Sequence, residues 1–366
     1  MLIRGAVLDT VGAQRPYAER RPLSVAELEL DPPGPNEILV EMEAAGVCHS
    51  DLSVVNGSRP RPVPMLLGHE GAGRVVEVSS NVGDLAVGQR VIATFLPRCG
   101  ECAECATGGV SPCPVGSAAN AAGSLMDGDV RLRRDGEPVL HHLGVSAFAT
   151  HAVMDRRSVV AIDDDVPPDG AALLGGAALT GGGAVLNSAR LQPGETAVVV
   201  GLGGVGLAAM LTALAVDDTR VIGVDPIEAK RRRAVDLGAE AMAPDEAIDA
   251  GLRGAVVIEA AGSARAFETA LALTAIGGRT VTVGLPDPAD LATVSPLVLV
   301  AEARTVIGSY LGSAVPSRDI PRLADMWRRG RLPLEELVSS EITLDELNGA
   351  MDALDDGEAI RQLVRF

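Results

Sequence analysis

Four of the five cysteines lie within fifteen residues, at the spacing C-x2-C-x2-C-x7-C: Cys99, Cys102, Cys105 and Cys113. This spacing suits a closed tetrahedral zinc site, in which four thiolates satisfy the ion and leave no open position. The alternatives are two disulfides or four idle thiols. Disulfides need an oxidising compartment, and residues 1–15 contain no apolar core of the kind that an export signal requires. We therefore expect a structural zinc ion and a cytoplasmic protein.

The fifth cysteine, Cys48, stands alone in the segment GVCHSD, and His69 stands in the segment GHEGAG. A thiolate and an imidazole are ligands that zinc prefers. Either residue alone would more often have a structural role. Together with the four-cysteine cluster and a nucleotide-binding fold, they become candidates for a second metal site.

A glycine-rich segment, GLGGVG at 201–206, follows an apolar, β-branched run at 196–200 and opens an apolar helical pattern that continues to Ala215. The G-x-G-x-x-G spacing alone is weak evidence, but a second strand-like run at 220–224 ends in Asp225, nineteen residues after the last glycine. A dinucleotide fold places an acid there to bind the adenosine ribose hydroxyls. We expect the pyrophosphate at the helix N-terminus, cradled by Gly201, Gly203, Gly204, Val205 and Gly206.

Asp225 also favours NAD over NADP, because its carboxylate would repel a 2′-phosphate. Lys230 follows five residues later and could reach the same ribose. The alternatives are an ordinary turn residue for Asp225 and a solvated helix charge for Lys230, beside the basic run 231–233.

Further strand-like runs and helical patterns alternate after this motif, which predicts a doubly wound α/β domain. The expected strands are 255–259 and 279–284, and the expected helices are 229–237 and 264–275. Elsewhere we expect a strand at 74–78, strand-like structure at 298–310, and amphipathic helices at 320–329 and 344–354.

These elements predict two domains, one of them discontinuous. Residues 1–177 are expected to form a β-rich, barrel-like catalytic domain with Gly/Pro turns. Residues 178–309 form the NAD-binding domain, and residues 310–366 return to the catalytic domain. The chain of 366 residues is long enough for both.

The composition, 47% hydrophobic and 22% charged, is that of a soluble globular protein. The net charge of −18 argues against binding nucleic acid or an anionic membrane surface, since phosphates would be repelled. Two uncharged stretches, 171–189 and 196–216, are as long as membrane spans. Glycines interrupt both stretches, so we expect neither to cross a membrane.

The chain resembles the zinc-containing alcohol dehydrogenases of the medium-chain dehydrogenase/reductase superfamily, almost from end to end. GVCHSD, GHEGAG, the cysteine cluster, GLGGVG with Asp225, and the tail Glu358–Arg361 carry the resemblance. The segment 127–153, with HHLGVSAF, is similar to the class I/III branch. The resemblance implies a GroES-like barrel domain, a Rossmann coenzyme domain and a homodimer or homotetramer.

The resemblance also implies roles for the residues of the catalytic domain. Cys48 and His69 would hold a catalytic zinc, and Asp51 would orient His69. Ser50 would accept the proton of the substrate hydroxyl, and Glu70 would lie behind the zinc. The bound zinc would lower the pKa of the alcohol, from which NAD takes hydride.

For the cofactor, the resemblance implies two further groups of contacts. His49 and Arg361 would lie near the pyrophosphate. Val283, Gly284 and Leu285 would lie along the nicotinamide.

The pattern breaks at the third ligand of the catalytic zinc, which is normally a cysteine in this family. Alignment of the segment 174–181 places Gly176 there, and glycine has no side chain to offer. Glu70 could complete the site with Cys48 and His69, or the catalytic zinc could be lost or only partly occupied. A third alternative is that Gly176 is an introduced change in an otherwise ordinary enzyme. Gly176→Cys is predicted to raise the zinc content toward two ions per chain.

Three hypotheses of function follow. The leading one is an NAD-dependent, zinc-containing alcohol/aldehyde oxidoreductase that acts on a small molecule. The second is a reductase without catalytic zinc that acts on a polarised C=C or C=N bond. The third is a non-catalytic sensor or scaffold that binds NAD(H).

Overall fold

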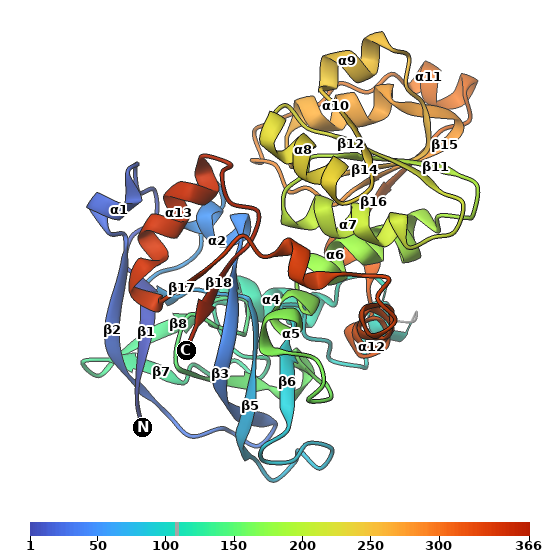
Figure 1. Ribbon diagram of the computed structural model, residues 1–366. Coiled ribbons are helices and arrows are strands. Elements are labelled where there is room, and N and C mark those ends of the chain that lie inside the picture. The colour runs from blue at the N-terminus through green and yellow to red at the C-terminus, as the bar shows by residue number, and fades with distance from the viewer. Residues whose placement is uncertain (107–109) are drawn as a thin grey trace. The chain divides into compact units, whose positions relative to one another are not determined.

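A computed structural model describes residues 1–106 and 110–366 of the chain, which fold into two compact units (Figure 1). The first unit consists of residues Met1–Gly176, Val315–Pro321 and Val338–Phe366. The second consists of Ala177–Ala314 and Arg322–Leu337. We call them the catalytic unit and the nucleotide unit.

The catalytic unit is built on a closed β-barrel and a mixed sheet, as expected for a GroES-like domain. The barrel order is β1 (Leu2–Leu8), β2 (Leu23–Leu30), β7 (Leu132–Arg134), β8 (Glu137–His141) and β4 (Met65–Leu66). The second sheet has the order β10 (Val159–Ala161), β6 (Arg90–Ala93), β5 (Glu70–Val78), β3 (Glu37–Val47), β18 (Gln362–Arg365) and β17 (Ser340–Ile342), and β9 (His151–Asp155) pairs with β3. The sheets enclose an apolar core of mainly aliphatic side chains, and the aromatic Phe148 is the largest side chain that is fully buried.

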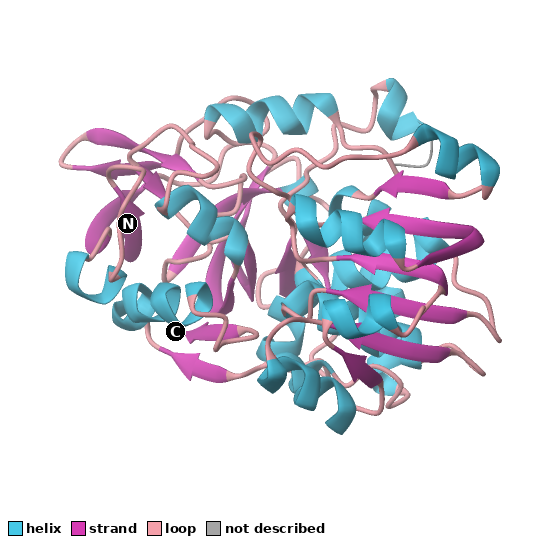
Figure 2. Ribbon diagram, turned by 90° about the horizontal axis from the view of Figure 1, so that it is seen from above, coloured by secondary structure: helices cyan, strands magenta, loops and turns pink. Residues whose placement is uncertain are grey.

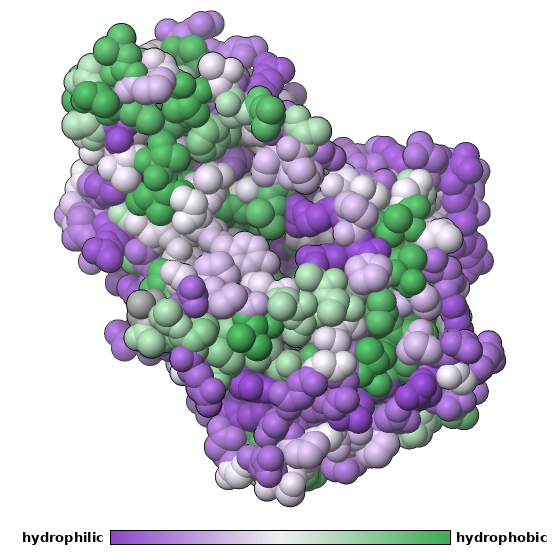
Figure 3. Space-filling model, turned by 180° about the vertical axis from the view of Figure 1, so that it is seen from behind, coloured by the Kyte–Doolittle hydropathy of each residue, from purple (hydrophilic) through white to green (hydrophobic). Residues whose placement is uncertain are grey.

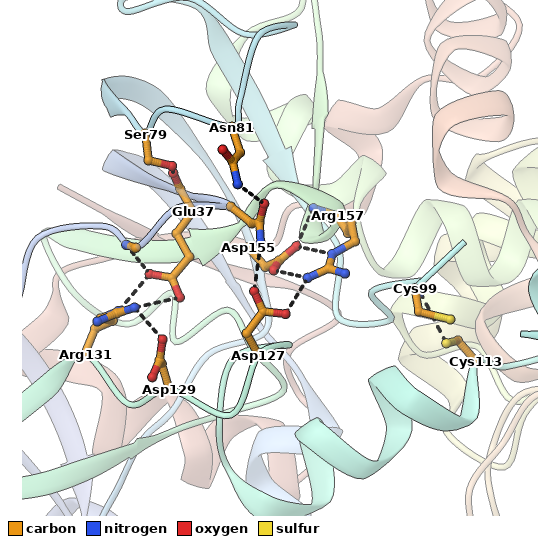
Figure 4. A network of polar contacts seen from close by, with 12 residues as sticks. Glu37, Ser79, Asn81, Cys99, Cys113, Asp127, Asp129, Arg131, Asp155 and Arg157 are labelled. Atoms are coloured by element: carbon orange, nitrogen blue, oxygen red, sulfur yellow. Dashed lines mark hydrogen bonds and ion pairs between the residues drawn. The ribbon is translucent and has the colours of Figure 1, made fainter. Parts of the chain in front are cut away.

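Short helices cover this unit and fill its connections. They are α1 (Tyr17–Arg20), α2 (His49–Val55), α3 (Ala103–Ala106), α4 (Pro114–Ala122), α5 (Pro168–Leu174) and α13 (Leu347–Asp355), with the 3-10 turns η1 (Arg156–Ser158) and η5 (Leu344–Glu346). Ion pairs lie at the paired ends of strands β3 and β9: Glu37 of β3 accepts from Arg131, and Asp155 of β9 accepts from Arg157 (Figure 4).

The nucleotide unit contains a parallel sheet with helices packed against it, so the doubly wound fold is confirmed (Figure 2). The strand order is β13 (Glu240–Met242), β12 (Arg220–Val224), β11 (Thr196–Val200), β14 (Gly254–Glu259), β15 (Thr274–Thr282) and β16 (Thr305–Gly308). The helical segments are α6 (Ala177–Gly183), η2 (Ala184–Ala189), α7 (Gly204–Leu214), α8 (Glu228–Asp236), α9 (Pro244–Asp249), α10 (Ala264–Ala272), α11 (Pro296–Ala301), η3 (Tyr310–Ser313) and η4 (Leu334–Leu337).

Most predicted elements of this unit are confirmed, and three differ. The strands at 196–200 and 220–224 have the predicted bounds. The strand predicted at 279–284 spans Thr274–Thr282 instead, with an irregularity around Gly277, whose φ is +72°, where its register with β14 shifts. The helix predicted at 264–275 ends sooner, at Ala272. The prediction of strand-like structure from 298 is wrong, since Pro296 opens the short helix α11 and only Thr305–Gly308 is a strand.

The chain divides between the units differently from the predicted boundaries in its last sixty residues. Helix α12 (Pro316–Arg328) begins in the catalytic unit and ends in the nucleotide unit. The segment after it, up to Leu337, belongs to the nucleotide unit. Its leucines are buried there, and Glu336 pairs with Arg233 of α8.

Among the described residues, no single helix is long and apolar enough to cross a membrane. One bent pair, Pro168–Leu174 with Ala177–Ala189, meets the test by length and composition only.

Candidate metal centre and nucleotide site

The candidate metal ligands of the catalytic unit lie between the end of strand β3 and the start of strand β5. Cys48 follows the last residue of β3 and precedes helix α2, and Glu70 is the first residue of β5. His69 directly precedes Glu70, after Gly68 has turned the chain with a φ of +89° that favours glycine. Cys48, His69 and Glu70 are all buried, and one ligand atom from each lies within 4.8 Å of the others.

Asp51 holds this arrangement together from the first turn of α2. Its buried carboxylate accepts hydrogen bonds from the backbone N–H of Cys48 at 3.3 Å and of Gly68 at 3.1 Å. Its Oδ1 also lies 3.1 Å from Nδ1 of His69, which leaves Nε2 of that ring for a metal. The role implied for Asp51 therefore has a direct geometric basis.

The charges of the site depend on one another. Burial opposes ionisation of Cys48, but the charge of Arg361 and the hydrogen bond with His69 outweigh it and lower the thiol pKa to about 5. Burial likewise disfavours the charged form of His69, yet the Asp51 carboxylate raises the imidazole pKa well above its ordinary value. A thiolate is the form in which cysteine binds a metal.

Glu70 occupies the space that a side chain at position 176 would need. A Cβ atom on Gly176 would lie 1.8 Å from Oε1 of Glu70 and 2.3 Å from its Cδ. On the opposing strand, a Cβ on Gly46 would lie 2.4 Å from Oε2. The Glu70 carboxylate is thus enclosed between two glycines, and only glycine leaves room for it at either position.

Arg361 is the partner of this carboxylate. Its guanidinium donates to Oε1 of Glu70 at 3.1 Å and to the carbonyl of Val47 at 3.1 Å. Oε2 of Glu70 is buried and has no hydrogen-bond partner among the described residues. Burial raises the pKa of Glu70 to about 7, although the positive charge of Arg361 opposes the shift. A buried carboxylate oxygen without a partner, close to a thiolate and an imidazole, fits a metal ion.

The four-cysteine cluster has the geometry of a zinc site. The ligand atoms of Cys99, Cys102, Cys105 and Cys113 lie within 4.8 Å of one another, and none of these described cysteines forms a disulfide. The sulfurs of Cys102 and Cys113 are 3.8 Å apart. Four sulfurs bound tetrahedrally at about 2.3 Å from zinc are about 3.8 Å from one another, so the cluster fits the ion.

Backbone N–H groups prepare Cys113 as a thiolate. Cys99 and Gly116 donate to its sulfur at 3.4 and 3.5 Å, the first visible in Figure 4. Although burial favours the thiol, these donors lower the Cys113 pKa to about 6. Gly116 has to be a glycine, because a Cβ there would lie 2.1 Å from the carbonyl oxygen of Pro97.

In the nucleotide unit, the glycine-rich segment turns from β11 into α7 as the motif predicts. Gly201 has a φ of +92°, and Gly203 has no side chain to cap the first N–H groups of α7. A Cβ on Gly206 would lie 1.8 Å from the carbonyl oxygen of Gly201. The loop therefore leaves backbone N–H groups and positive dipole at the helix N-terminus, which fits a pyrophosphate.

Asp225 lies at the carboxyl end of the neighbouring strand, β12. Its Oδ2 accepts from the N–H of Leu202 and its Oδ1 from that of Ile227, both at 2.8 Å. These bonds fix the carboxylate beside the glycine-rich segment. Lys230 lies half-buried on α8, six residues from the end of β12.

The remaining predicted residues lie at or beside the ends of helices and strands, and they differ in exposure. His49 is exposed and Ser50 half-buried on the first turn of α2. Val283, Gly284 and Leu285 follow the last residue of β15. Arg361, predicted to lie near the pyrophosphate, is buried in the catalytic unit against Glu70.

Sequence reasoning missed two aromatic rings beside His69. Phe95 and His142 lie edge-on to it, with ring centroids 5.3 and 5.5 Å away. Nδ1 of His142 is 3.2 Å from Oδ1 of Asp51. The sequence offers no signal for this, because His142 is distant from the other site residues along the chain.

Comparison with known proteins agrees with this architecture. The family profile "Alcohol dehydrogenase GroES-like domain" matches residues 34–164, and "Zinc-binding dehydrogenase" matches residues 204–328. The putative alcohol dehydrogenase D of Mycobacterium tuberculosis is 36% identical over 94% of this chain and 96% of its own length. The NDMA-dependent alcohol dehydrogenase of Amycolatopsis methanolica is 33% identical over 100% of this chain and 99% of its own. The crystal structure of benzyl alcohol dehydrogenase from Acinetobacter calcoaceticus covers 100% of this chain and 99% of its own, with a TM-score of 0.91 and 28% identity.

The fold and these relatives define an oxidoreductase class. The chain belongs to the zinc-binding alcohol dehydrogenase family of the medium-chain dehydrogenase/reductase superfamily.

Proposed function

We propose that this protein is an NAD-dependent alcohol dehydrogenase in which Cys48, His69 and Glu70 hold the catalytic zinc. The observation that carries the proposal is the position of Glu70. Its side chain fills the space beside Gly176, and one of its carboxylate oxygens lies within 4.8 Å of the ligand atoms of Cys48 and His69. A thiolate, an imidazole and a carboxylate form an acceptable set of zinc ligands, with a fourth position left for substrate.

When bound, zinc would lower the pKa of an alcohol hydroxyl, and NAD would serve as the hydride acceptor. The protein's own residues orient the zinc ligands and accept the proton of the substrate hydroxyl. Asp51 fixes the ring of His69 and the backbone before it. Ser50, two residues after Cys48 and half-buried, is the proposed acceptor of the hydroxyl proton.

NAD is preferred over NADP in this proposal because Asp225 presents a carboxylate beside the glycine-rich segment. A 2′-phosphate on the adenosine ribose would meet this negative charge. The same site would hold NAD by the N–H groups of α7 and by hydrogen bonds from the ribose hydroxyls to Asp225.

One observation favours a second candidate, a reductase without catalytic zinc that acts on a polarised C=C or C=N bond. Arg361 already pairs with Glu70 at 3.1 Å, and its positive charge also faces Cys48. Without a metal, the positive charge of Arg361 could therefore balance the negative charges of Glu70 and Cys48.

Zinc content per chain, measured by elemental analysis on protein purified without chelator, separates the two candidates. Two ions per chain, falling to one in a Cys48→Ala variant, would support the alcohol dehydrogenase. One ion per chain in the wild type, with no change in Cys48→Ala, would contradict it. An NADH absorbance assay on alcohols, aldehydes, enones and imines then identifies the reaction.

The proposal includes a homodimer or homotetramer in the cytoplasm. Edge strand β16 and helix α11 expose hydrophobic side chains on the nucleotide unit, including Leu297 and Val300, and Figure 3 shows such residues gathered on this unit at the upper left. A second copy of the chain is a suitable partner for an unpaired edge strand with apolar neighbours. Four thiols placed to bind zinc are best kept in a reducing compartment.

A further inference from the structure

Glu259 is a buried acid in the nucleotide unit to which the proposed function gives no role. It is the last residue of β14, and its side chain is almost fully enclosed. Its Oε1 accepts from the N–H of Ala261 at 2.9 Å and of Gly262 at 2.6 Å. Its Oε2 accepts from Oγ1 of Thr282 at 2.7 Å, so the carboxylate joins the loop after β14 to the end of β15.

The segment that follows β15 rests directly on Glu259. The Glu259 carbonyl accepts from the N–H of Val283 at 2.9 Å and of Gly284 at 3.3 Å. A Cβ on Gly284 would lie 2.4 Å from the nitrogen of Gly262 and 2.8 Å from Oε1 of Glu259. The segment therefore has no space to move toward the carboxylate, and its backbone is tied to the same residue.

The strand order indicates which half of a dinucleotide would meet this segment. Asp225 ends β12, the glycine-rich segment follows β11, and β14 and β15 continue the sheet on the other side of β11. If the adenosine ribose binds Asp225 and the pyrophosphate binds at the N-terminus of α7, the nicotinamide half of the dinucleotide extends toward β14 and β15. Adjacent strands are about 4.8 Å apart, so the residues after β15 lie about 10 Å from β11, within reach of a nicotinamide nucleoside.

We propose that Glu259 is a positioning residue for the nicotinamide half of the cofactor, acting through Val283–Leu285. This inference rests on the proposed binding of NAD. Hydrogen bonds to a charged carboxylate are strong, and a segment held in advance loses less conformational entropy when a ligand binds. The ADP half of the cofactor would use Asp225 and the α7 N-terminus, and neither is hydrogen-bonded to Glu259.

The test compares the binding of NADH with that of ADP-ribose, which lacks the nicotinamide, by isothermal titration calorimetry. Thr282→Val removes the donor to Oε2 and leaves the bonds of Oε1 to Ala261 and Gly262. Glu259→Leu removes the whole carboxylate, whereas Glu259→Gln keeps its size and can form bonds to the same partners. Thr280→Val is the matched control, because Thr280 is buried on the same strand and its hydroxyl bonds Thr274 instead.

We expect Thr282→Val and Glu259→Leu to weaken NADH binding at least about fivefold while the affinity for ADP-ribose stays within about twofold. Glu259→Gln should restore most of the NADH affinity, and Thr280→Val should leave the ratio of the two affinities unchanged. An equal loss for both ligands, or no loss for NADH in Thr282→Val, overturns the inference while the proposed cofactor stands. Wild-type protein that binds neither ligand overturns the proposed cofactor and this inference with it.

Discussion

Glu70 is the residue on which the chemistry of the candidate metal centre depends. The sequence predicted that position 176 lacks a ligand, and it left open whether Glu70 replaces it. The structure gives a steric reason for the pairing, because the Glu70 carboxylate lies where a side chain of residue 176 would begin. The same carboxylate bonds Arg361, a contact that no sequence pattern indicated.

Gly176→Ala is expected to displace Glu70 and empty the metal site. The added methyl would meet Oε1 and Cδ of Glu70 at 1.8 and 2.3 Å, and alanine offers no ligand in exchange. We expect zinc to fall from two ions to one per chain and alcohol oxidation to fall at least about tenfold. Gly176→Cys should keep two ions, because its thiolate replaces the displaced carboxylate.

The matched control for these substitutions is Gly83→Ala, which places a methyl in open space in the same unit. It should retain the zinc content and activity of the wild type. Full zinc content in Gly176→Ala would show that Glu70 is not a ligand.

At the scale of elements, the sequence predicts a strand or helix well where its residue pattern is compatible with only one kind of element. The buried parallel strands β11 and β12 are short runs rich in valine and isoleucine, and their predicted bounds are confirmed. The prediction fails near α11, where valines and leucines are exposed rather than buried. An apolar run alone does not distinguish a buried strand from a helix whose apolar side chains are exposed.

The sequence could predict the members of the metal centre only in part. Motifs reveal Cys48 and His69 because both lie in short, recognisable segments. His142 follows the barrel strand β8 and Arg361 precedes β18, so only the tertiary structure brings these two residues to the site.

Strand β3 supplies a prediction about pH. Its Glu43 accepts from the buried Arg90 at 2.7 Å, and this hydrogen bond outweighs burial and lowers the Glu43 pKa below its ordinary value. Glu43→Gln should reduce the free energy of unfolding by about 1–2 kcal/mol at pH 7, a value discounted because Glu43 is partly exposed. Because the pKa of Glu43 is lower in the folded protein, its carboxylate stabilises the fold at pH values above its pKa in the unfolded chain, about 4.5. This stabilisation is lost as the pH falls and Glu43 becomes protonated. The difference between variant and wild type should therefore shrink below that pH.

Urea unfolding at a series of pH values measures this difference. Glu77→Gln, at an exposed position on the neighbouring strand β5, is the control and should unfold like the wild type throughout. A Glu43→Gln deficit that stays constant from pH 7 to pH 3 would contradict the electrostatic origin.

At the scale of the whole molecule, the exposed apolar surface of α11 predicts self-association. Val300 is 82% exposed and Leu297 is 75% exposed, beside the unpaired edge of β16. The double substitution Leu297→Asp and Val300→Asp should convert the oligomer to smaller species, because carboxylates cannot be buried in an apolar interface without a large cost. Sedimentation velocity measures the change.

Val235→Asp is the control, since Val235 is also exposed on a helix of the nucleotide unit but lies on α8. It should leave the oligomer intact. A wild-type protein that sediments as a monomer at micromolar concentration would contradict the proposed interface.

The enclosure of Glu70 between Gly46 and Gly176 also constrains how this site can change during evolution. Any side chain gained at position 46 or 176 collides with the carboxylate, so neither glycine can be replaced first without disturbing the acid. Unless the new residue at 176 is itself a ligand, as cysteine would be, shortening or turning away Glu70 must come before a larger residue at 176. A lineage that takes this route passes through an intermediate with only two ligands. The three positions are therefore expected to show strong epistasis, and a deep mutational scan should find that substitutions of Gly176 other than cysteine, which brings its own thiolate, are tolerated only in backgrounds where residue 70 has already changed.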